Sequence, residues 1–342
     1  MRLRRGPEDD YLHPLEDDPT FNESRYYNFS AAESGVAGSN VGGWVRMGNR
    51  PNEGHAEMTV CLYLPDGRVG FMFKRAAIDG HDAHDAAGLR FDVVTPYQEH
   101  HVTYGGDVCV LAHPREMADP KSAFTSNPHE ACAIDLHLVA AAQPFGGEPE
   151  WEEGEVPPPG SQHGFARGHT EQHMTITGTV AVGDEQFELT DAVGFRDHSW
   201  GPRVWQAIPW YRWLNACFGP LGIAFTLRGW EGGRNVNGFV YDIARYGDDR
   251  IVRVDDVELT TEYDDELFPV RSIALVTAGD HTYELRGEIW SDIPLRNRRD
   301  GKVTRITESM TRWTCNGLAG AGLTEHLDQI VDDVPLGNAA GV

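Results

Sequence analysis

Short runs rich in β-branched and aromatic residues recur along almost the whole chain of 342 residues. EMTVCLYL, GFVYDIARY and YELRGEIW are three of them, and many of the runs alternate between apolar and polar residues. Such alternation is typical of strands with one buried face. No segment carries an apolar stripe at helical spacing over three turns. The sequence therefore predicts an all-β protein.

Turn signals separate these runs at the spacing of an antiparallel meander. They include Pro65-Asp66-Gly67, Gly105-Gly106, Gly183-Asp184, Gly247-Asp248 and Asp300-Gly301. Residues 144–164 are rich in Pro, Gly and Glu, a composition typical of a surface linker. Each flanking segment, 1–143 and 165–342, holds enough strands to close a barrel or sandwich. We expect two packed β-barrel-like domains joined by this linker.

Acidic residues outnumber basic ones by 53 to 29, which gives a formal net charge of −24. A surface this acidic repels nucleic acid and anionic membranes, and it also serves general solubility. Five cysteines occur without a CxxC pair, which argues against a disulfide framework or a structural zinc. The N-terminus lacks the apolar run of a signal peptide, and no stretch of about 20 apolar residues could span a membrane. We expect a cytoplasmic protein without an integral membrane segment.

The stretch GFRDHSWGPR, residues 194–203, places a cation, an acid, an imidazole and an indole side by side. Arg196 could hold a carboxylate through two hydrogen bonds. An Asp197 side chain in an apolar lumen would have a raised pKa and could donate a proton, which His198 could relay. The alternative is a structural Arg–Asp pair that fixes a turn, with His198 and Trp200 as packing residues.

The strand candidate HTEQHMTITGTV places His169, Glu171 and His173 on one face. Two histidines and one carboxylate can bind a metal. A solvent-facing polar strand has the same pattern. The clusters HDAHD (residues 81–85) and EHH (residues 99–101) can likewise be solvated polar groups in loops or at strand ends. No metal site is therefore predicted.

Aromatic residues are concentrated at the end of the motif and directly after it: Trp200, Trp205, Trp210, Tyr211 and Trp213. Indole faces can bind cations or flat apolar ligands. A core cluster of a β domain would look the same, and a ligand-holding lumen is lined by residues of this kind.

GFRDHSWGPR, together with HTEQHMTITGTV before it and GLAGAGLTEHLDQ near the C-terminus, resembles the lipocalin-like superfamily that includes carotenoid 1,2-hydratases and AttH-type proteins. The likeness runs from about Phe21 to Gln329. It implies two packed lipocalin-like β-barrels and a cofactor-independent activity that hydrates, isomerises or cyclises unsaturated isoprenoid-type substrates. It assigns the proton donor to Asp197 and adjoining site positions to His198 and Trp200. An arginine precedes Asp197 where the carotenoid hydratases carry an aromatic residue, so we expect a smaller hydrophobe such as a terpenoid, steroid or polyketide.

The resulting hypothesis is an acid–base lyase or isomerase without a cofactor, and its oligomeric state is not predicted. The catalytic residues are predicted to be Asp197, His198 and Glu171, with Asp197 held by Arg196 or His198. The predicted substrate-binding residues are Arg196, Trp200, Arg203, Trp205, Trp210, Tyr211 and Glu325. Glu325 is expected within about 10 Å of Asp197, or in a buried ion pair with Arg196 or Arg203. A non-catalytic carrier of a hydrophobic ligand is the alternative function.

Overall fold

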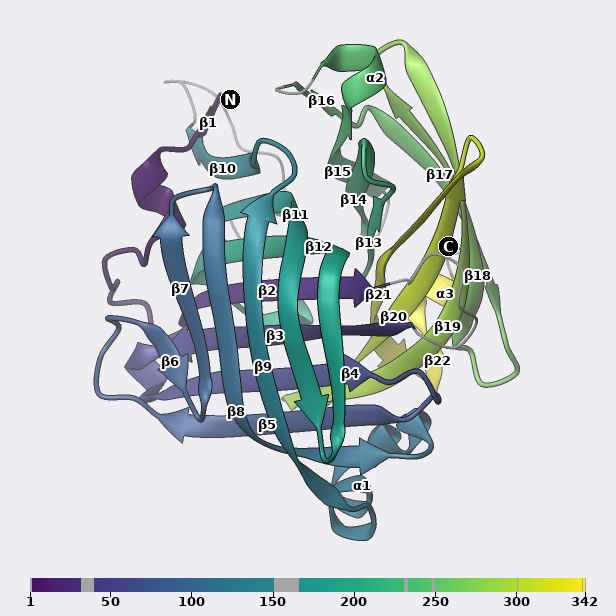
Figure 1. Ribbon diagram of the computed structural model, residues 1–342. Helices are drawn as coiled ribbons and strands as arrows, with labels where there is room; N and C mark the ends of the chain where they lie inside the picture. The colour runs from purple at the N-terminus through teal and green to yellow at the C-terminus, as the bar shows by residue number, and fades with distance from the viewer. Residues whose placement is uncertain are drawn as a thin grey trace.

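The computed structural model describes residues 2–31, 40–150, 166–230, 233–247, 250–299, 301–339 and 341. These residues form two large antiparallel sheets that lie against each other (Figure 1). The predicted all-β class with two lipocalin-like halves is confirmed. Most of the predicted linker lies outside the described residues, although Phe145–Glu150 forms a strand.

The first sheet contains twelve strands from the N-terminal part of the chain. They are β1 (Arg2–Arg4), β2 (Phe21–Ala31), β3 (Val41–Arg50), β4 (His55–Tyr63), β5 (Val69–Ala77), β6 (His84–Ala86), β7 (Leu89–Thr95), β8 (Glu99–Leu111), β9 (His129–Ala140), β10 (Phe145–Glu150), β11 (Gly168–Val182) and β12 (Glu185–Pro202). β9 pairs with both β8 and β11. The pairing therefore returns on itself through β11, β12, β2, β3, β4, β5, β8 and β9, which closes a barrel.

The second sheet contains ten strands in the order β16-β15-β14-β13-β21-β20-β19-β18-β17, with β22 paired to β21. The strands are β13 (Trp210–Cys217), β14 (Leu221–Trp230), β15 (Gly233–Asp242), β16 (Ile251–Arg253), β17 (Asp256–Tyr263), β18 (Pro269–Ala278), β19 (His281–Arg299), β20 (Lys302–Cys315), β21 (Leu318–Val331) and β22 (Val334–Pro335). Nearly all connections join neighbouring strands, as expected from the turn signals.

The chain passes from one sheet to the other between β12 and β13, at residues 203–209. β11 and β12 belong to the first sheet, although the sequence analysis placed them in the second half. The change of sheet therefore follows the RDHSWG motif and does not coincide with residues 144–164. β12 pairs with β2 over ten residues, and this pairing completes the first barrel. For this reason β11 and β12 belong to the first sheet and not, as the sequence analysis expected, to the second.

Three apolar cores follow from this arrangement. One fills the first barrel, one lies against the inner face of the second sheet, and the third lies between the sheets. The third is rich in aromatic residues and includes Tyr26, Trp44, Tyr63, Phe195, Tyr211, Trp213 and Phe239. The motif strand β12 borders both the barrel interior and this aromatic layer.

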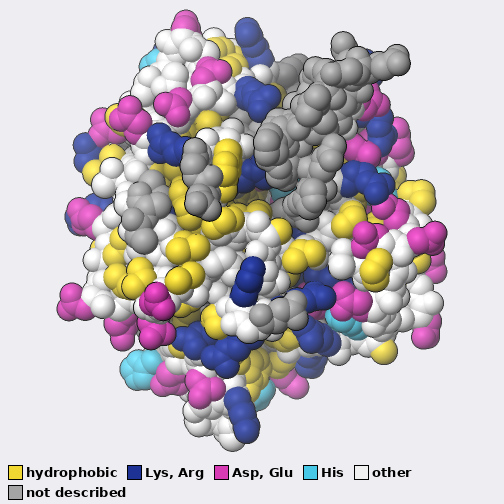
Figure 2. All heavy atoms as spheres, turned by 180° about the vertical axis from the view of Figure 1, so that it is seen from behind, with side chains coloured by type: hydrophobic (Ala, Val, Ile, Leu, Met, Phe, Trp, Pro, Cys, Tyr) yellow, Lys and Arg dark blue, Asp and Glu magenta, His cyan; other side chains and the backbone are white. Residues whose placement is uncertain are grey.

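Helices are few and short among the described residues. They are α1 (Pro120–Ser126), α2 (Ile243–Tyr246) and α3 (Leu336–Ala339), with 3-10 turns at Pro7–Asp10, Pro51–Glu53, Pro114–Ala118 and Trp205–Ala207. In the part of the chain that the structure describes, no helix has the length and apolar character to cross a membrane. Figure 2 shows acidic side chains spread over the rear face, with Lys and Arg side chains gathered toward its lower middle.

Candidate active site between the sheets

β12 carries the motif between β11 and β2. Successive side chains of a strand point to opposite faces, so the motif is divided between two environments. Asp197 and Phe195 face the second sheet, and the Phe195 ring lies 5.7 Å from that of Trp213 on β13. Arg196 and His198 face the barrel interior.

Four carboxyl groups lie close together between the sheets, and we call them the inter-sheet carboxylates: Glu171, Asp197, Glu308 and Glu325. Glu171 is directly opposite Asp197 in the β11–β12 pair, and Glu308 is opposite Glu325 in the β20–β21 pair. The three glutamates are 2%, 4% and 8% exposed, respectively, whereas Asp197 is only half-buried. Asp197 is therefore the member that a ligand can most readily reach.

Aromatic side chains of β13 connect the two carboxylate pairs. Trp213 Nε1 donates a hydrogen bond of 2.6 Å to Glu171 Oε1, and Trp213 is opposite Glu325 in the sheet. The Tyr211 hydroxyl donates to Glu325 Oε1. His169 Nε2 lies 3.3 Å from Glu171 Oε1. These contacts fix the orientation of Glu171 and Glu325 and leave the Asp197 carboxyl as the reactive candidate.

Burial raises the pKa of Asp197, and the nearby charge of Glu171 adds to this effect. His169 and Arg203 oppose it, but the pKa remains above its usual value. Burial lowers the pKa of His169, yet its hydrogen bond and charge interaction with Glu171 raise it overall. The site thus combines a carboxyl that favours its protonated form with an imidazole that favours its charged form.

Burial also raises the pKa of Glu308 and of Glu325. The charge of Glu325 adds to the shift of Glu308, and the charge of Asp197 adds to that of Glu325. Two carboxyl groups in contact cannot both ionise at low cost, so the pair holds a proton. The charge of Asp197 thus links the two carboxylate pairs electrostatically.

We predict that the free energy of unfolding falls as the pH rises above the ordinary range of a glutamate. A carboxyl with a raised folded-state pKa contributes stability that is present below its unfolded pKa and is lost as the pH rises through its folded pKa. Glu308→Gln keeps a neutral side chain at every pH, so its decline should be shallower. Urea unfolding between pH 4.5 and pH 9 measures this, with the exposed Glu258→Gln as the control. Parallel curves for Glu308→Gln and the wild-type protein would contradict the shared proton.

Two arginines supply positive charge beside Asp197. Arg203 donates hydrogen bonds to Ser199 Oγ at 2.6 Å and to Ser24 Oγ at 3.1 Å, and burial lowers its pKa to about 10. The guanidinium groups of Arg46 and Arg203 lie 5.5 Å and 5.1 Å from the Trp205 ring centroid. Both arginines lower the pKa of Asp197, and they would stabilise its carboxylate after it gives up a proton.

Several predicted site residues lie away from Asp197. Arg196 binds Asp10 Oδ1 at 2.8 Å and Gln172 Oε1 at 2.9 Å, and His198 Nε2 binds Glu23 Oε1 at 2.7 Å. Neither residue holds Asp197, contrary to the expectation, because neighbouring residues of a strand face opposite sides.

The indoles of Trp200 and Trp210 also point elsewhere. The ring of Trp200 stacks on that of His13 in the barrel, at 3.9 Å. Trp210 belongs to the core of the second sheet, where the Arg212 guanidinium lies 5.6 Å from its ring centroid.

The other predicted residues meet between the sheets: Asp197, Glu171, Arg203, Trp205, Tyr211 and Glu325. Sequence reasoning missed Glu308, Arg46 and His169 as companions of Asp197. Arg46 lies on β3, far from the motif in the sequence, and only the pairing of the strands brings it near Asp197. Glu308 lies in a strand without any distinctive motif.

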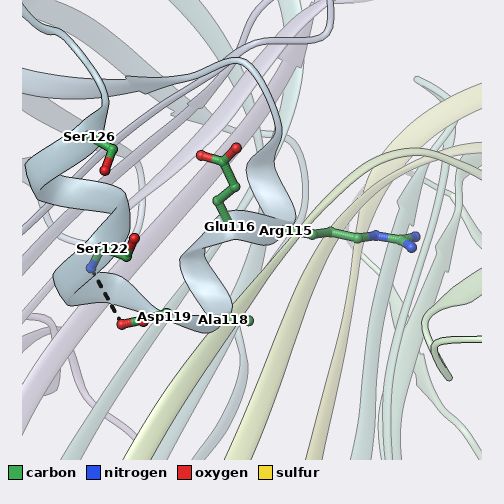
Figure 3. A pocket seen from close by; sticks show the side chains of 6 residues that line it. All are labelled: Arg115, Glu116, Ala118, Asp119, Ser122 and Ser126. Atoms are coloured by element: carbon green, nitrogen blue, oxygen red, sulfur yellow. Dashed lines mark hydrogen bonds between the residues drawn. The ribbon is translucent and has the colours of Figure 1, made fainter.

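A surface hollow of about 490 Å³ lies beside α1, lined by Arg115, Glu116, Ala118, Asp119, Ser122 and Ser126 (Figure 3). Arg115 points away from α1 and binds both carboxylate oxygens of Asp292 on β19, at 3.0 Å and 2.9 Å. None of the lining residues is an inter-sheet carboxylate or its partner. The hollow therefore contributes nothing to the candidate site.

Residues 6–330 match the model of a protein family described as a domain of unknown function, DUF7064. The chain belongs to this family. No curated protein matches the sequence of this DUF7064 protein.

Several solved structures are similar to the DUF7064 protein. A protein from Nitrosomonas europaea described as an AttH has a TM-score of 0.55 and 14% identity, over 95% of this chain and 96% of that one. Kievitone hydratase from Nectria haematococca has a TM-score of 0.54 and 8% identity, over 97% and 94%. CghA, solved with Sch210972, has a TM-score of 0.51 and 14% identity, over 95% and 96%. These similarities confirm the lipocalin-like fold that the motif implied.

Proposed function

We propose that this protein is a lyase or isomerase that uses acid–base chemistry on an unsaturated hydrophobic small molecule, with Asp197 as the general acid. The observation that carries the proposal is the half-buried Asp197 carboxyl, which lies close to three buried glutamates and whose pKa is raised by burial and by the charge of Glu171. A carboxyl with a raised pKa holds its proton to higher pH and is better suited to donate it during catalysis. The name of one structural neighbour, kievitone hydratase, supports this class of reaction.

In the proposed reaction, Asp197 gives its proton to one carbon of a C=C bond, and positive charge develops on the other carbon. The indole of Trp213, the Tyr211 ring and the nearby carboxylates stabilise that charge. In a hydration, water adds to the cation and then returns a proton to Asp197. In an isomerisation or cyclisation, the proton returns to Asp197 from a neighbouring carbon of the substrate.

His169 takes the place that the sequence analysis gave to His198. Its pKa is raised, and the charge interaction with Asp197 places it beside the acid. A charged His169 stabilises the Asp197 carboxylate that remains after proton donation. Glu171 receives hydrogen bonds from Trp213 and His169, so we assign it the role of positioning the imidazole.

The aromatic layer between the sheets supports a substrate with a large apolar surface. A terpenoid, steroid or polyketide skeleton with a double bond or an ionisable hydroxyl group fits these requirements. Incubation of the protein with a library of such compounds, followed by mass spectrometry, tests the proposal. A gain or loss of water, or an isomer with a new retention time, is the expected result. Heat-denatured protein is the control.

A non-catalytic carrier is the second candidate, because Tyr211 and Trp213 already engage Glu325 and Glu171 with hydrogen bonds. In a carrier these contacts would only shape the wall of a binding site. Recovery of bound but unchanged ligands throughout the library would favour the carrier and contradict the enzyme.

A further inference from the structure

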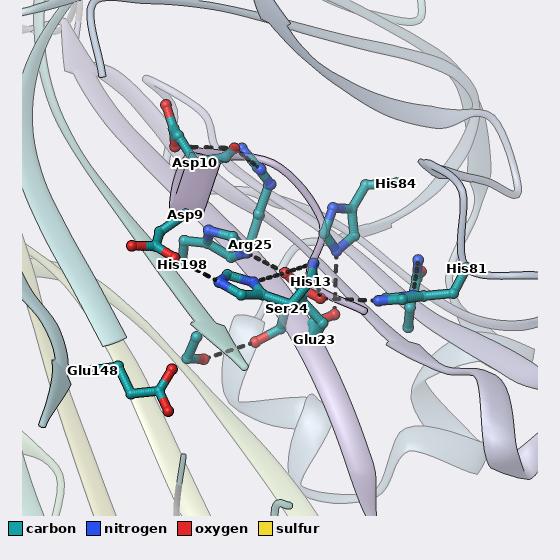
Figure 4. A network of polar contacts seen from close by, with 12 residues as sticks. Asp9, Asp10, His13, Glu23, Ser24, Arg25, His81, His84, Glu148 and His198 are labelled. Atoms are coloured by element: carbon teal, nitrogen blue, oxygen red, sulfur yellow. Dashed lines mark hydrogen bonds and ion pairs between the residues drawn. The ribbon is translucent and has the colours of Figure 1, made fainter. Parts of the chain in front are cut away.

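The opposite face of β12 contains a second polar cluster, which Figure 4 shows around Glu23 of β2. Three imidazoles bind this carboxylate: His13 Nδ1 and His198 Nε2 lie 2.8 Å and 2.7 Å from Oε1, and His81 Nε2 lies 2.9 Å from Oε2. The sequence analysis predicted no metal and assigned His198 to the Asp197 site. The structure instead places His198 beside three residues that come from distant parts of the sequence.

The two oxygens of Glu23 have different surroundings. The His13 and His198 imidazoles converge on Oε1, which also accepts a hydrogen bond of 3.2 Å from the backbone N–H of His13. Oε2 accepts hydrogen bonds from His81 and, at 2.9 Å, from the same backbone N–H. One potential ligand atom from each of His13, Glu23 and His198 lies within 4.8 Å of the others. A carboxylate that binds a metal through one oxygen and accepts hydrogen bonds on the other has this arrangement.

We propose that His13, Glu23 and His198 bind one divalent transition-metal ion, with His81 as the outer residue that orients Glu23. Two imidazole nitrogens and one carboxylate oxygen form a ligand set suited to Zn²⁺ and Fe²⁺. In a tetrahedral site with bonds of about 2.0 to 2.1 Å, ligand atoms lie about 3.3 Å apart. The present contacts of 2.7 Å and 2.8 Å to Oε1 need only a small expansion to reach that spacing.

The surroundings of the ligands support an ion at this position. Asp9 Oδ1 lies 3.3 Å from His13 Nε2, so this carboxylate can accept a hydrogen bond from the outer N–H of His13 when Nδ1 binds the ion. His13 also stacks on Trp200, at 3.9 Å between ring centroids. Arg25 is a positive charge near Glu23, but it forms an ion pair with Asp10, with 3.8 Å between Arg25 Nη1 and Asp10 Oδ1.

The proposed site has an entry route and a structural consequence. The His13 side chain is 12% exposed, whereas Glu23 and His198 are fully buried, so an ion can enter beside His13. His13 lies between the 3-10 turn Pro7–Asp10 and β2, where the described chain forms neither helix nor strand. A bound ion would tie this segment to two barrel strands, and three protein ligands leave a position open for water or a small ligand.

Metal analysis of the full chain, purified without an affinity tag, tests the proposal directly. We expect about one ion per chain, removal of the ion by a chelator with a fall of several degrees in Tm, and recovery on adding Zn²⁺. Co²⁺ added to the chelator-treated protein should produce visible absorption bands typical of nitrogen and oxygen ligands. Cleavage by a protease in the segment around His13 should increase after the ion is removed.

Variants separate this site from other metal-binding groups. His13 lies at the accessible edge of the cluster, so the His13→Ala variant should fold. Its Zn²⁺ affinity should fall by at least ~100-fold, because loss of a metal ligand weakens binding more than loss of a residue that only orients a ligand. His81→Asn should lower the affinity by about 10- to 100-fold. The surface group His101, Asp135 and His137 is the other metal-compatible cluster among the described residues. The double variant His101→Ala/His137→Ala is therefore the matched control and should bind like the wild-type protein.

Two results would overturn the proposal. One is a protein that contains no metal as purified and shows no change in Tm or Co²⁺ absorption with added ions. The other is binding that is lost in the His101/His137 control but retained in His13→Ala. Neither result bears on Asp197, because the Glu23 cluster lies on the opposite face of β12.

Discussion

Asp197→Asn is expected to lower turnover by about two to four orders of magnitude, the usual contribution of a general acid. Asparagine has nearly the same shape as aspartic acid but cannot donate an acidic proton. The carboxyl it replaces is half-buried and has a raised pKa, so the wild-type side chain is protonated over a wider pH range than an exposed aspartate. The measurement is kcat/KM with whichever library compound the wild-type protein converts.

Asp191→Asn is the matched control for this prediction. Asp191 lies on the same strand β12 but is exposed, so the variant removes a carboxyl without touching the candidate site. It should keep the turnover of the wild-type protein. Folding of both variants is checked by Tm, and Asp197→Asn should not destabilise the fold, because asparagine keeps a neutral side chain of nearly the same shape in this half-buried position. Undiminished turnover in a folded Asp197→Asn protein would exclude the acid role.

The class of fold could be predicted from the sequence because β-structure has a local signature. Alternation and turn dipeptides appear within a few residues, and the sheets follow most of them. The predicted turn at Gly105-Gly106 was wrong, because these glycines lie inside β8 and pair with β9. The point where the chain changes sheet could not be predicted in this way. It depends on the pairing of β12 with β2, which are separated by more than 150 residues.

The candidate site shows the same division between local and long-range information. The motif identified Asp197, and the alternation of β11 correctly placed Glu171 on the same side as His169. The same period of two should have separated Asp197 from Arg196 and His198, but the motif was treated as one cluster. Glu308 could not have been found, because only the β20–β21 register brings it opposite Glu325.

The other large effect is expected at the barrel side of the motif, at Arg196. This side chain is 1% exposed and makes an ion pair with Asp10, whose carboxyl is fully buried. Burial alone would raise the pKa of Asp10, but Arg196, His100 and Arg25 together hold it well below its usual range. The ion pair also ties the 3-10 turn Pro7–Asp10 to β12, far away in the sequence.

Arg196→Met should therefore lower the free energy of unfolding by about 3 to 5 kcal/mol, because it keeps much of the side-chain volume but leaves a buried carboxylate without its main partner. The double variant Arg196→Met/Asp10→Asn should recover much of the loss, since the uncompensated charge is then gone. Urea unfolding measures both.

Below its Tm, folded Arg196→Met should turn over substrate within roughly a few-fold of the wild-type rate, because Arg196 and Asp197 face opposite sides of β12. A variant with normal stability and lost turnover would instead show that Arg196 acts in the site, as the sequence first suggested.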